Sequence, residues 1–243
     1  SLTQTSKAQP GAQNGSVELP QELSLFLGEA ITPRIGTFLQ FTYEPAEGHL
    51  AVDNLDIRYA NQATLGHTSV IYGVTVNNNP TVQDVWNSVP AWGYPYSASG
   101  VAPTPAAATL IDGGLGQTVA GIGTYALWGN RLYTEFSVYR SAPQGAAVPA
   151  DATAENTLRG IAPYWRAMLQ HSWGSNYLAV GTYGMRTSLF PAGVTGLTDR
   201  RLDVALDAQY EHGTTGATFT AHATWIHERQ VLDATFDAGG SNA

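Results

Sequence analysis

Two side chains of this sequence could together carry out acid–base chemistry, namely Asp207 and His222. They occupy polar positions in two neighbouring segments in which polar and apolar residues alternate. An Asp–His pair can act as a general base that activates water for hydrolysis. Two polar residues that line a water-filled lumen would produce the same pattern without any chemistry, and we adopt this simpler interpretation. We therefore predict no catalytic residues and no enzyme, with a hydrolase that uses Asp207 and His222 as an alternative.

Other residue types exclude most cofactor and metal chemistry. The six histidines show neither His-Glu-x-x-His nor any other ligand spacing. The chain has no cysteine, which excludes disulfides, iron–sulfur ligation and covalent attachment of a c-type haem in this chain. The glycine-rich run 113–116 is not followed by the Gly-Lys-Ser/Thr of a phosphate loop, and we interpret it, with Gly121 and Gly123, as loop and packing positions. We predict neither a metal site nor a cofactor.

The charge and the apolar content exclude two further classes of protein. The formal net charge is −8 and Lys7 is the only lysine, which disfavours nucleic-acid binding. No apolar run approaches the ~18 residues that a transmembrane helix needs. Charged residues make up 12% of the chain, about half the usual share for a soluble globular protein.

The elements that must position the polar residues are β-strands. In segment 201–211, Leu202, Val204 and Leu206 fall on one face of a strand. Asp203 and Asp207 fall on the opposite face, whereas a helix would scatter all of these residues around its circumference. Similar patterns predict further strands at 22–27, 35–43, 54–60, 69–77, 118–128, 131–140, 164–173, 177–189 and 217–228. Most of these strands approach the ~9–11 residues of a membrane-spanning strand, whereas the mean strand of a soluble protein has about 5–6.

The connections between the expected strands alternate between short and long from residue 78 onwards. Tight turns follow Trp128, Trp173 and Glu211, and the long connections are 78–117, 141–161 and 190–199. Outer-membrane barrels have short periplasmic turns and long extracellular loops. A soluble sandwich has no physical reason to alternate in this way, because both of its ends face the same solvent. Aromatic residues gather beside the short turns, as in an interfacial girdle: Tyr59, Trp128, Tyr133, Trp173, Tyr177 and Tyr210.

We therefore expect an all-β protein, an antiparallel transmembrane β-barrel over residues 21–243 with about ten visible strands. Residues 1–20 form a polar lead, either a loop or disordered. If the short turns are periplasmic, the first strand of this set begins outside the cell and the last strand ends there, so both ends of the set lie outside. We therefore also expect a larger barrel, with at least one more strand at each end.

Two groups of residues are candidates for function in such a barrel. The connection 78–117 carries the aromatic residues Trp86, Trp92, Tyr94 and Tyr96, which indicate a packed loop. It could fold into the barrel as a constriction or plug, or lie over the mouth as an extracellular cap. The second group comprises the polar residues expected to line a hydrated lumen: Asp56, Arg58, Glu135, Arg166, Arg186, Arg201, Asp203, Asp207, Glu211, His222 and Glu228.

Three stretches carry a family resemblance: 74–93, which reads VTVNNNPTVQDVWNSVPAWG, 53–60, which reads DNLDIRYA, and 102–108, which reads APTPAAA. They resemble proteobacterial outer-membrane, porin-like proteins, many of which are labelled "cytochrome c" because a Cys-x-x-Cys-His haem segment precedes the barrel. The likeness runs from about Leu23 to Asp237. It implies residence in the outer membrane and a role near extracellular electron transfer. Because this sequence has no cysteine, we carry over only the barrel.

We predict an outer-membrane channel for small solutes or ions, embedded in outer-membrane lipid, that selects by size and by lumen charge. One alternative is a barrel that encloses or docks a separate cytochrome. The others are the hydrolase above and a soluble β-sandwich or lectin.

Overall fold

The computed structural model describes residues 2–3, 15–17, 23–44, 49–86, 88–89, 108–142, 156–191, 193 and 195–239. The described chain is all-β, and its main body is an 11-stranded antiparallel sheet. The strands are β3 (Leu23–Thr32), β4 (Ile35–Glu44), β5 (His49–Leu65), β6 (Thr68–Asn77), β7 (Val119–Trp128), β8 (Leu132–Ser141), β9 (Asn156–Leu158), β10 (Ala162–Trp173), β11 (Asn176–Pro191), β12 (Asp199–Gly213) and β13 (Thr218–Leu232). Every strand predicted from alternation is present, and several extend beyond the predicted ends.

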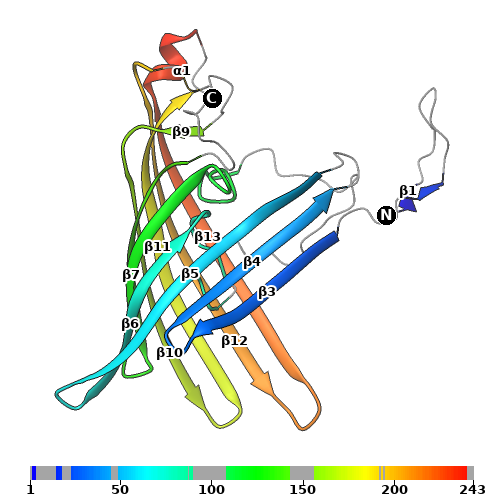
Figure 1. Cartoon of the computed structure of the whole chain (residues 1–243), viewed down its shortest axis with the longest axis vertical. Coiled ribbons are helices and arrows are strands. Elements are labelled where there is room, and N and C mark those ends of the chain that lie inside the picture. The colour runs from blue at the N-terminus through cyan, green and yellow to red at the C-terminus, as the bar shows by residue number, and fades with distance from the viewer. Residues whose placement is uncertain are drawn as a thin grey trace.

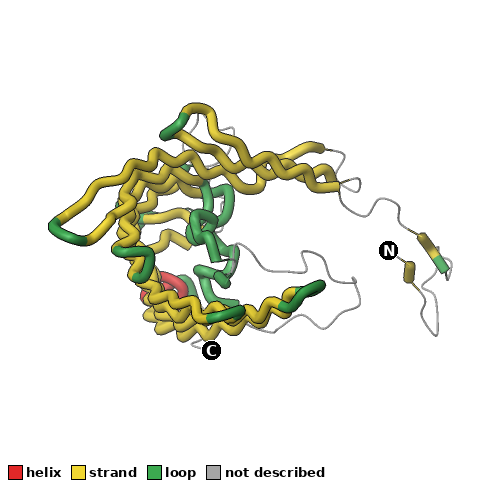
Figure 2. Tube along the Cα trace, turned by 90° about the horizontal axis from the view of Figure 1, so that it is seen from below, coloured by secondary structure: helices red, strands yellow, loops and turns green. Residues whose placement is uncertain are grey.

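The sheet is a curved wall in which consecutive strands are neighbours, in the order β13-β12-β11-β10-β8-β7-β6-β5-β4-β3. The wall curls around a concave side and stays open between β3 and β13, the two edge strands of the described part (Figure 2). The tight turns, such as those after Leu65, Trp128 and Trp173, all lie at one end of the wall (Figure 1). The long connections therefore lie at the other end, which we call the long-loop end.

Four small elements were not predicted. β9 lies within the expected loop 141–161 and pairs with the last residues of β11. The helix α1 (Asp233–Asp237) follows β13, and the Asp199 carboxylate on β12 accepts the backbone N–H groups of Ala234 and Thr235. Within the polar lead, β1 (Leu2–Thr3) and β2 (Ser16–Val17) form a two-stranded antiparallel pair. In the described part of the chain, no helix is long and apolar enough to cross a membrane.

The two faces of the wall have opposite character. On β12 the concave residues Asp203, Ala205 and Asp207 are buried, whereas the convex residues between them are exposed. Side chains alternate across a strand, so this follows directly from the period-two pattern of the sequence. The convex face thus exposes large apolar side chains, among them Ile57, Val76, Ile122, Phe136, Leu169, Val180, Leu206, Phe219 and Trp225.

Glycines on the concave face make room for large rings. A Cβ atom at Gly121 would overlap the ring of Tyr139, and one at Gly73 would overlap the Tyr59 carbonyl and the Tyr125 ring. The prediction that Gly121 is a packing position is confirmed.

The long connection between β6 and β7 folds into the concavity. Its described parts, 78–86, 88–89 and 108–118, lie inside the curve of the sheet (Figure 2). Leu110, Ile111 and Leu115 form a core there with side chains of the concave face, including Tyr164, Tyr183, Met185 and Leu189. We call these described parts the inserted segment.

Candidate functional site

The inserted segment is held by a buried ion cluster on the concave face. The Arg166 guanidinium on β10 binds Asp207 on β12, with Nη2 at 2.7 Å from Oδ2 and Nη1 at 3.3 Å from Oδ1. The same Nη2 lies 3.0 Å from Oδ1 of Asp84 in the inserted segment, and all three side chains are 0% exposed or nearly so. Ser88 completes the cluster: its hydroxyl donates to Asp207 and its backbone N–H donates to Asp84. One arginine thus joins two strands of the wall to the segment.

Desolvation makes this cluster costly to break. Burial raises the pKa of the Asp84 carboxyl above its ordinary value, and Arg166 opposes that rise. The guanidinium therefore stabilises the charged form of the Asp84 carboxyl against this desolvation. A buried charge left without its partner costs several kcal/mol, roughly 3–5.

Trp86 anchors the same part of the segment. Its indole N–H donates to Tyr177 Oη (2.6 Å) and to Gln170 Oε1 (3.1 Å), and its ring meets Tyr133 edge-on at 5.1 Å. The Arg166 guanidinium lies over the indole at 5.5 Å. The buried ring stabilises the segment by removing apolar area from water, and the hydrogen bonds of its N–H fix the orientation of the ring.

Gln83 ties the segment to the neighbouring strands. Its amide donates to Glu135 (2.6 Å) and to Tyr139 Oη (3.1 Å), and Arg58 donates to its backbone carbonyl. Arg58 also pairs with Asp56 on its own strand at 2.7 Å. Glu135 further accepts from Tyr133 and Ser137, which satisfies a carboxylate that is almost fully buried.

The second half of the segment binds two carboxylates at the long-loop end. The Leu110 N–H donates to Glu228 (2.7 Å) and the Ile111 N–H donates to Asp203 (3.0 Å). Asp203 and Glu228 are directly opposite each other on β12 and β13. Arg201 lies 3.5 Å from Glu228, on the same face. Asp203 and Glu228 thus accept hydrogen bonds from backbone N–H groups that lie 92 and 118 residues away in sequence.

The segment enters the concavity through a strained backbone. Thr81 is buried and has φ of 77°, which is unusual for a β-branched residue. Such a conformation costs on the order of 1–3 kcal/mol and persists only where the surroundings impose it. The contacts of Gln83, Asp84 and Trp86 directly after Thr81 supply that constraint.

The described residues of the connection 78–117 lie inside the concavity, and Trp86 among them is 6% exposed. This placement favours a constriction or plug over a cap, and the role of the connection stays a prediction. Trp92, Tyr94 and Tyr96 lie outside the described residues. The predicted hydration of the lumen residues needs correction, because Asp56, Glu135, Arg166, Asp203 and Asp207 are buried beneath the segment or against one another.

Most of the residues predicted to line a lumen do lie on the concave face. The part-buried members are Arg58, Arg201, Glu211 and Glu228, and His222 is concave but exposed on the edge strand β13. Arg186 was assigned wrongly: it is exposed and lies opposite Leu202, on the convex face. The reason is that its neighbours Tyr183, Met185 and Leu189 turn inward to pack on the apolar part of the inserted segment.

Asp207 and His222 do not form a dyad. The residue opposite His222 is Gln209, and the residue opposite Asp207 is Thr224. Both oxygens of the Asp207 carboxylate are engaged by Arg166, and one also by Ser88. The structure offers this pair no geometry for activating water.

Sequence reasoning missed the residues of the segment that make these contacts: Gln83, Asp84 and Ser88. The quoted run 74–93 contains all three, and the polar residues within it were the available signal. The strand residues that bind their side chains lie 52 to 119 positions away in sequence, so no local spacing reveals them.

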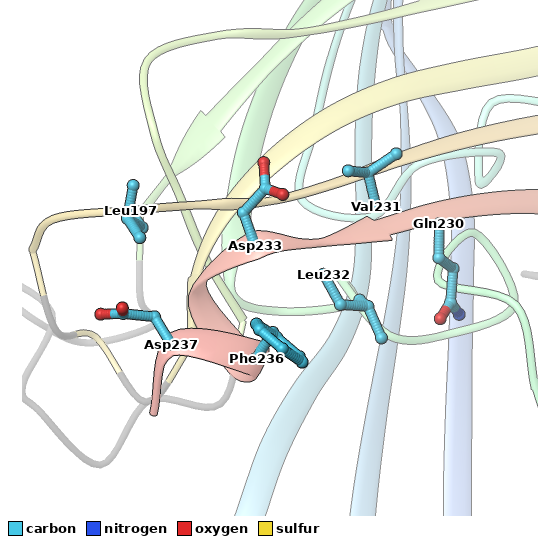
Figure 3. Close-up of a pocket in the computed structure, with 7 residues that line it drawn as sticks. All are labelled: Leu197, Gln230, Val231, Leu232, Asp233, Phe236 and Asp237. Carbon is cyan, nitrogen blue, oxygen red and sulfur yellow. The ribbon is translucent and has the colours of Figure 1, made fainter. Parts of the chain in front are cut away.

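A separate pocket of about 710 Å³ lies at the long-loop end, between the end of β13 and α1. It is lined by Leu197, Gln230, Val231, Leu232, Asp233, Phe236 and Asp237 (Figure 3). None of these residues takes part in the ion cluster. Its rim carries the exposed pair Arg200–Asp233, whose atoms are 3.0 Å apart.

The described residues contain no group of three or more His, Asp or Glu side chains that could hold a metal ion. Comparisons of the chain with protein-family models, with curated proteins and with solved structures found no match. The likeness to outer-membrane porin-like proteins therefore stays a prediction.

Proposed function

We propose that this chain forms the wall of an outer-membrane, porin-like channel for small solutes or ions, and that the inserted segment narrows it. The proposal rests on one observation: apolar side chains are exposed on the convex face, whereas charged side chains are buried on the concave face. Leu206 and Phe136 on the convex face are 55% and 53% exposed, whereas Asp207 on the concave face is 3% exposed. A convex apolar face suits lipid, and a polar interior suits a channel.

The open edges of the wall fit the same proposal. Lipid cannot hydrogen-bond the free backbone groups of an edge strand, so β3 and β13 need strand partners in a membrane. The two edges are not paired with each other in the described part. A larger barrel, in which further strands close the wall, provides those partners.

The width that the inserted segment leaves open would set the size of the solutes that pass through the channel. With Arg186 on the convex face, the predicted lumen set holds six acids, Asp56, Glu135, Asp203, Asp207, Glu211 and Glu228, against the three arginines Arg58, Arg166 and Arg201. Most of these charges neutralise one another in buried contacts. The residual acidity favours cations weakly.

Single-channel recording in a planar bilayer tests this function. We expect conductance from the full chain, and we expect Glu211→Gln to shift the reversal potential towards anions, because Glu211 is concave and only part-buried. Glu29→Gln is the control, an exposed acid outside this set. Absence of conductance together with a co-purifying haem protein would instead favour the alternative in which the wall encloses a separate cytochrome.

The placement of the convex face in lipid is tested by two adjacent residues of β13. His222 is concave and Ala223 is convex, and both are exposed. In intact membranes, His222→Cys should react with a membrane-impermeant thiol reagent, whereas Ala223→Cys should stay protected until detergent extraction. The chain has no cysteine of its own to interfere. Equal reactivity of both variants before extraction would mean that the convex face lies in water.

A further inference from the structure

Three arginines surround one leucine on the convex face at the long-loop end. Arg186 on β11 and Arg229 on β13 lie directly opposite Leu202 of β12. Arg200 is the next convex position along β12, two residues before Leu202. Neighbouring strands are about 4.8 Å apart, so Arg186 and Arg229 start about 10 Å apart, within the reach of two arginine side chains. We call Arg186, Arg200 and Arg229 the convex arginine cluster.

The charge of this cluster is not balanced by its surroundings. Within the described residues, Arg186 and Arg229 make no side-chain hydrogen bond or ion pair. Arg200 pairs only with Asp233, and both side chains are 51% exposed, so the pair contributes little. The described convex positions of β11, β12 and β13 carry no aspartate or glutamate. Arg140 adds a further exposed convex arginine at the same end, on β8.

The cluster lies where an apolar belt ends. On β13 the convex residues run from Phe219 near the tight turn to Arg229. Ten residues of strand span about 34 Å, or about 24 Å along the membrane normal when the strand is tilted by 45°. This length matches the apolar band of about 25 Å on the outside of membrane barrels. His227, just below Arg229, stacks on Trp225 with 6.0 Å between ring centroids. An arginine costs little on a lipid-facing strand near the interface and much at the midplane, so the cluster marks headgroup depth.

We propose that the convex arginine cluster binds the phosphate groups of anionic lipid headgroups in the leaflet at the long-loop end. The proposal rests on the proposed position of the convex face in a membrane. An acidic chain, with net charge −8, places three of its arginines around one leucine at headgroup depth. One guanidinium group can donate hydrogen bonds to two oxygens of a phosphate. Several neighbouring guanidinium groups can therefore bind the same headgroup. Arg186 thus serves a lipid contact rather than the lumen.

The test uses the full chain in detergent, titrated with phosphatidylglycerol, with zwitterionic phosphatidylcholine and with inorganic phosphate. The rise in melting temperature gives an apparent affinity. We expect phosphatidylglycerol alone to stabilise the wild-type protein. Because each arginine near a lipid surface contributes about a fivefold gain in affinity, Arg186→Gln/Arg229→Gln should weaken the apparent affinity by about twenty-five-fold. Equal stabilisation by inorganic phosphate would overturn a lipid-headgroup site.

The matched control is Arg34→Gln/Arg131→Gln, two exposed arginines beside separate tight turns at the other end. An equal loss of affinity in the control would overturn the proposal, since the response would then follow total charge. The labelling of Ala223→Cys, measured on the same preparation in membranes, separates the two levels of failure. If Ala223→Cys is protected but the cluster variant binds as the wild type does, only this inference fails. If Ala223→Cys is unprotected, the proposed function fails.

Discussion

Replacing Arg166 with methionine is expected to release the inserted segment and to destabilise the protein by roughly 3–5 kcal/mol. Methionine fills much of the same volume but leaves the carboxylates of Asp84 and Asp207 buried without a cation. The stacking of the guanidinium on Trp86 and Tyr183 is lost as well. Urea unfolding in detergent measures the loss of stability. Cleavage of the segment by a protease and a rise in single-channel conductance report its release.

Two further variants separate the ion cluster from a general effect of losing an arginine. Arg131→Met, at an exposed position beside a tight turn, should change stability by less than about 0.5 kcal/mol. The triple variant Arg166→Met/Asp84→Asn/Asp207→Asn should recover much of the loss, because neutral partners do not carry the cost of a buried charge. If Arg166→Met unfolds no more readily than Arg131→Met, the cluster does not hold the segment.

The strands and their faces could be predicted because the physical cause is local. Segment 201–211 alternates cleanly, and β12 has the predicted faces with only two more residues at each end. The buried positions of β12 follow from the same alternation that the sequence displays. Gly121 likewise predicts close packing, although the sequence does not identify Tyr139 as the residue that packs there.

The contents of the concavity could not be predicted, because they depend on contacts between distant segments. Nothing in the sequence near Asp207 indicates Ser88, which lies 119 residues away. The expectation that Asp207 stays hydrated failed for this reason. The run 74–93 carries part of the family resemblance, and its described residues include those that bind the wall.

Arg186 is an exception to the rule that polar residues face the concave side of the wall and apolar residues face the convex side. The apolar side chains of the inserted segment need apolar partners, so Tyr183 and Met185 face inward beside Leu115. Their polar neighbour Arg186 must then face outward. A strand that contacts both a buried loop and a membrane has apolar residues on both faces, and its alternation no longer identifies the inner one.

Replacing Leu206 with arginine is expected to cost roughly 2–4 kcal/mol in a membrane, the cost of an arginine on the lipid face near the midplane. Leu206 lies on the convex face of β12, between Arg200 at one end of the apolar belt and Tyr210 near the other. Its side chain is 55% exposed, so it packs only partly against protein. In water, an arginine at such an exposed position would change stability by no more than about 0.5 kcal/mol. The exposure of Leu206 therefore makes this one variant a test of the surrounding medium.

The control is Leu178→Arg, at an exposed convex position of β11 next to the tight turn after Trp173 and away from the convex arginine cluster. Near the interface an arginine on the lipid face costs only about 0–1 kcal/mol. In phospholipid vesicles, reversible urea unfolding should thus show that Leu206→Arg is much less stable than both the wild type and Leu178→Arg. In water, neither exposed position would lose much stability. Two variants with the same small effect would therefore place the convex face in solvent, whereas a loss of stability that is large at Leu206 and small at Leu178 follows the depth of a bilayer.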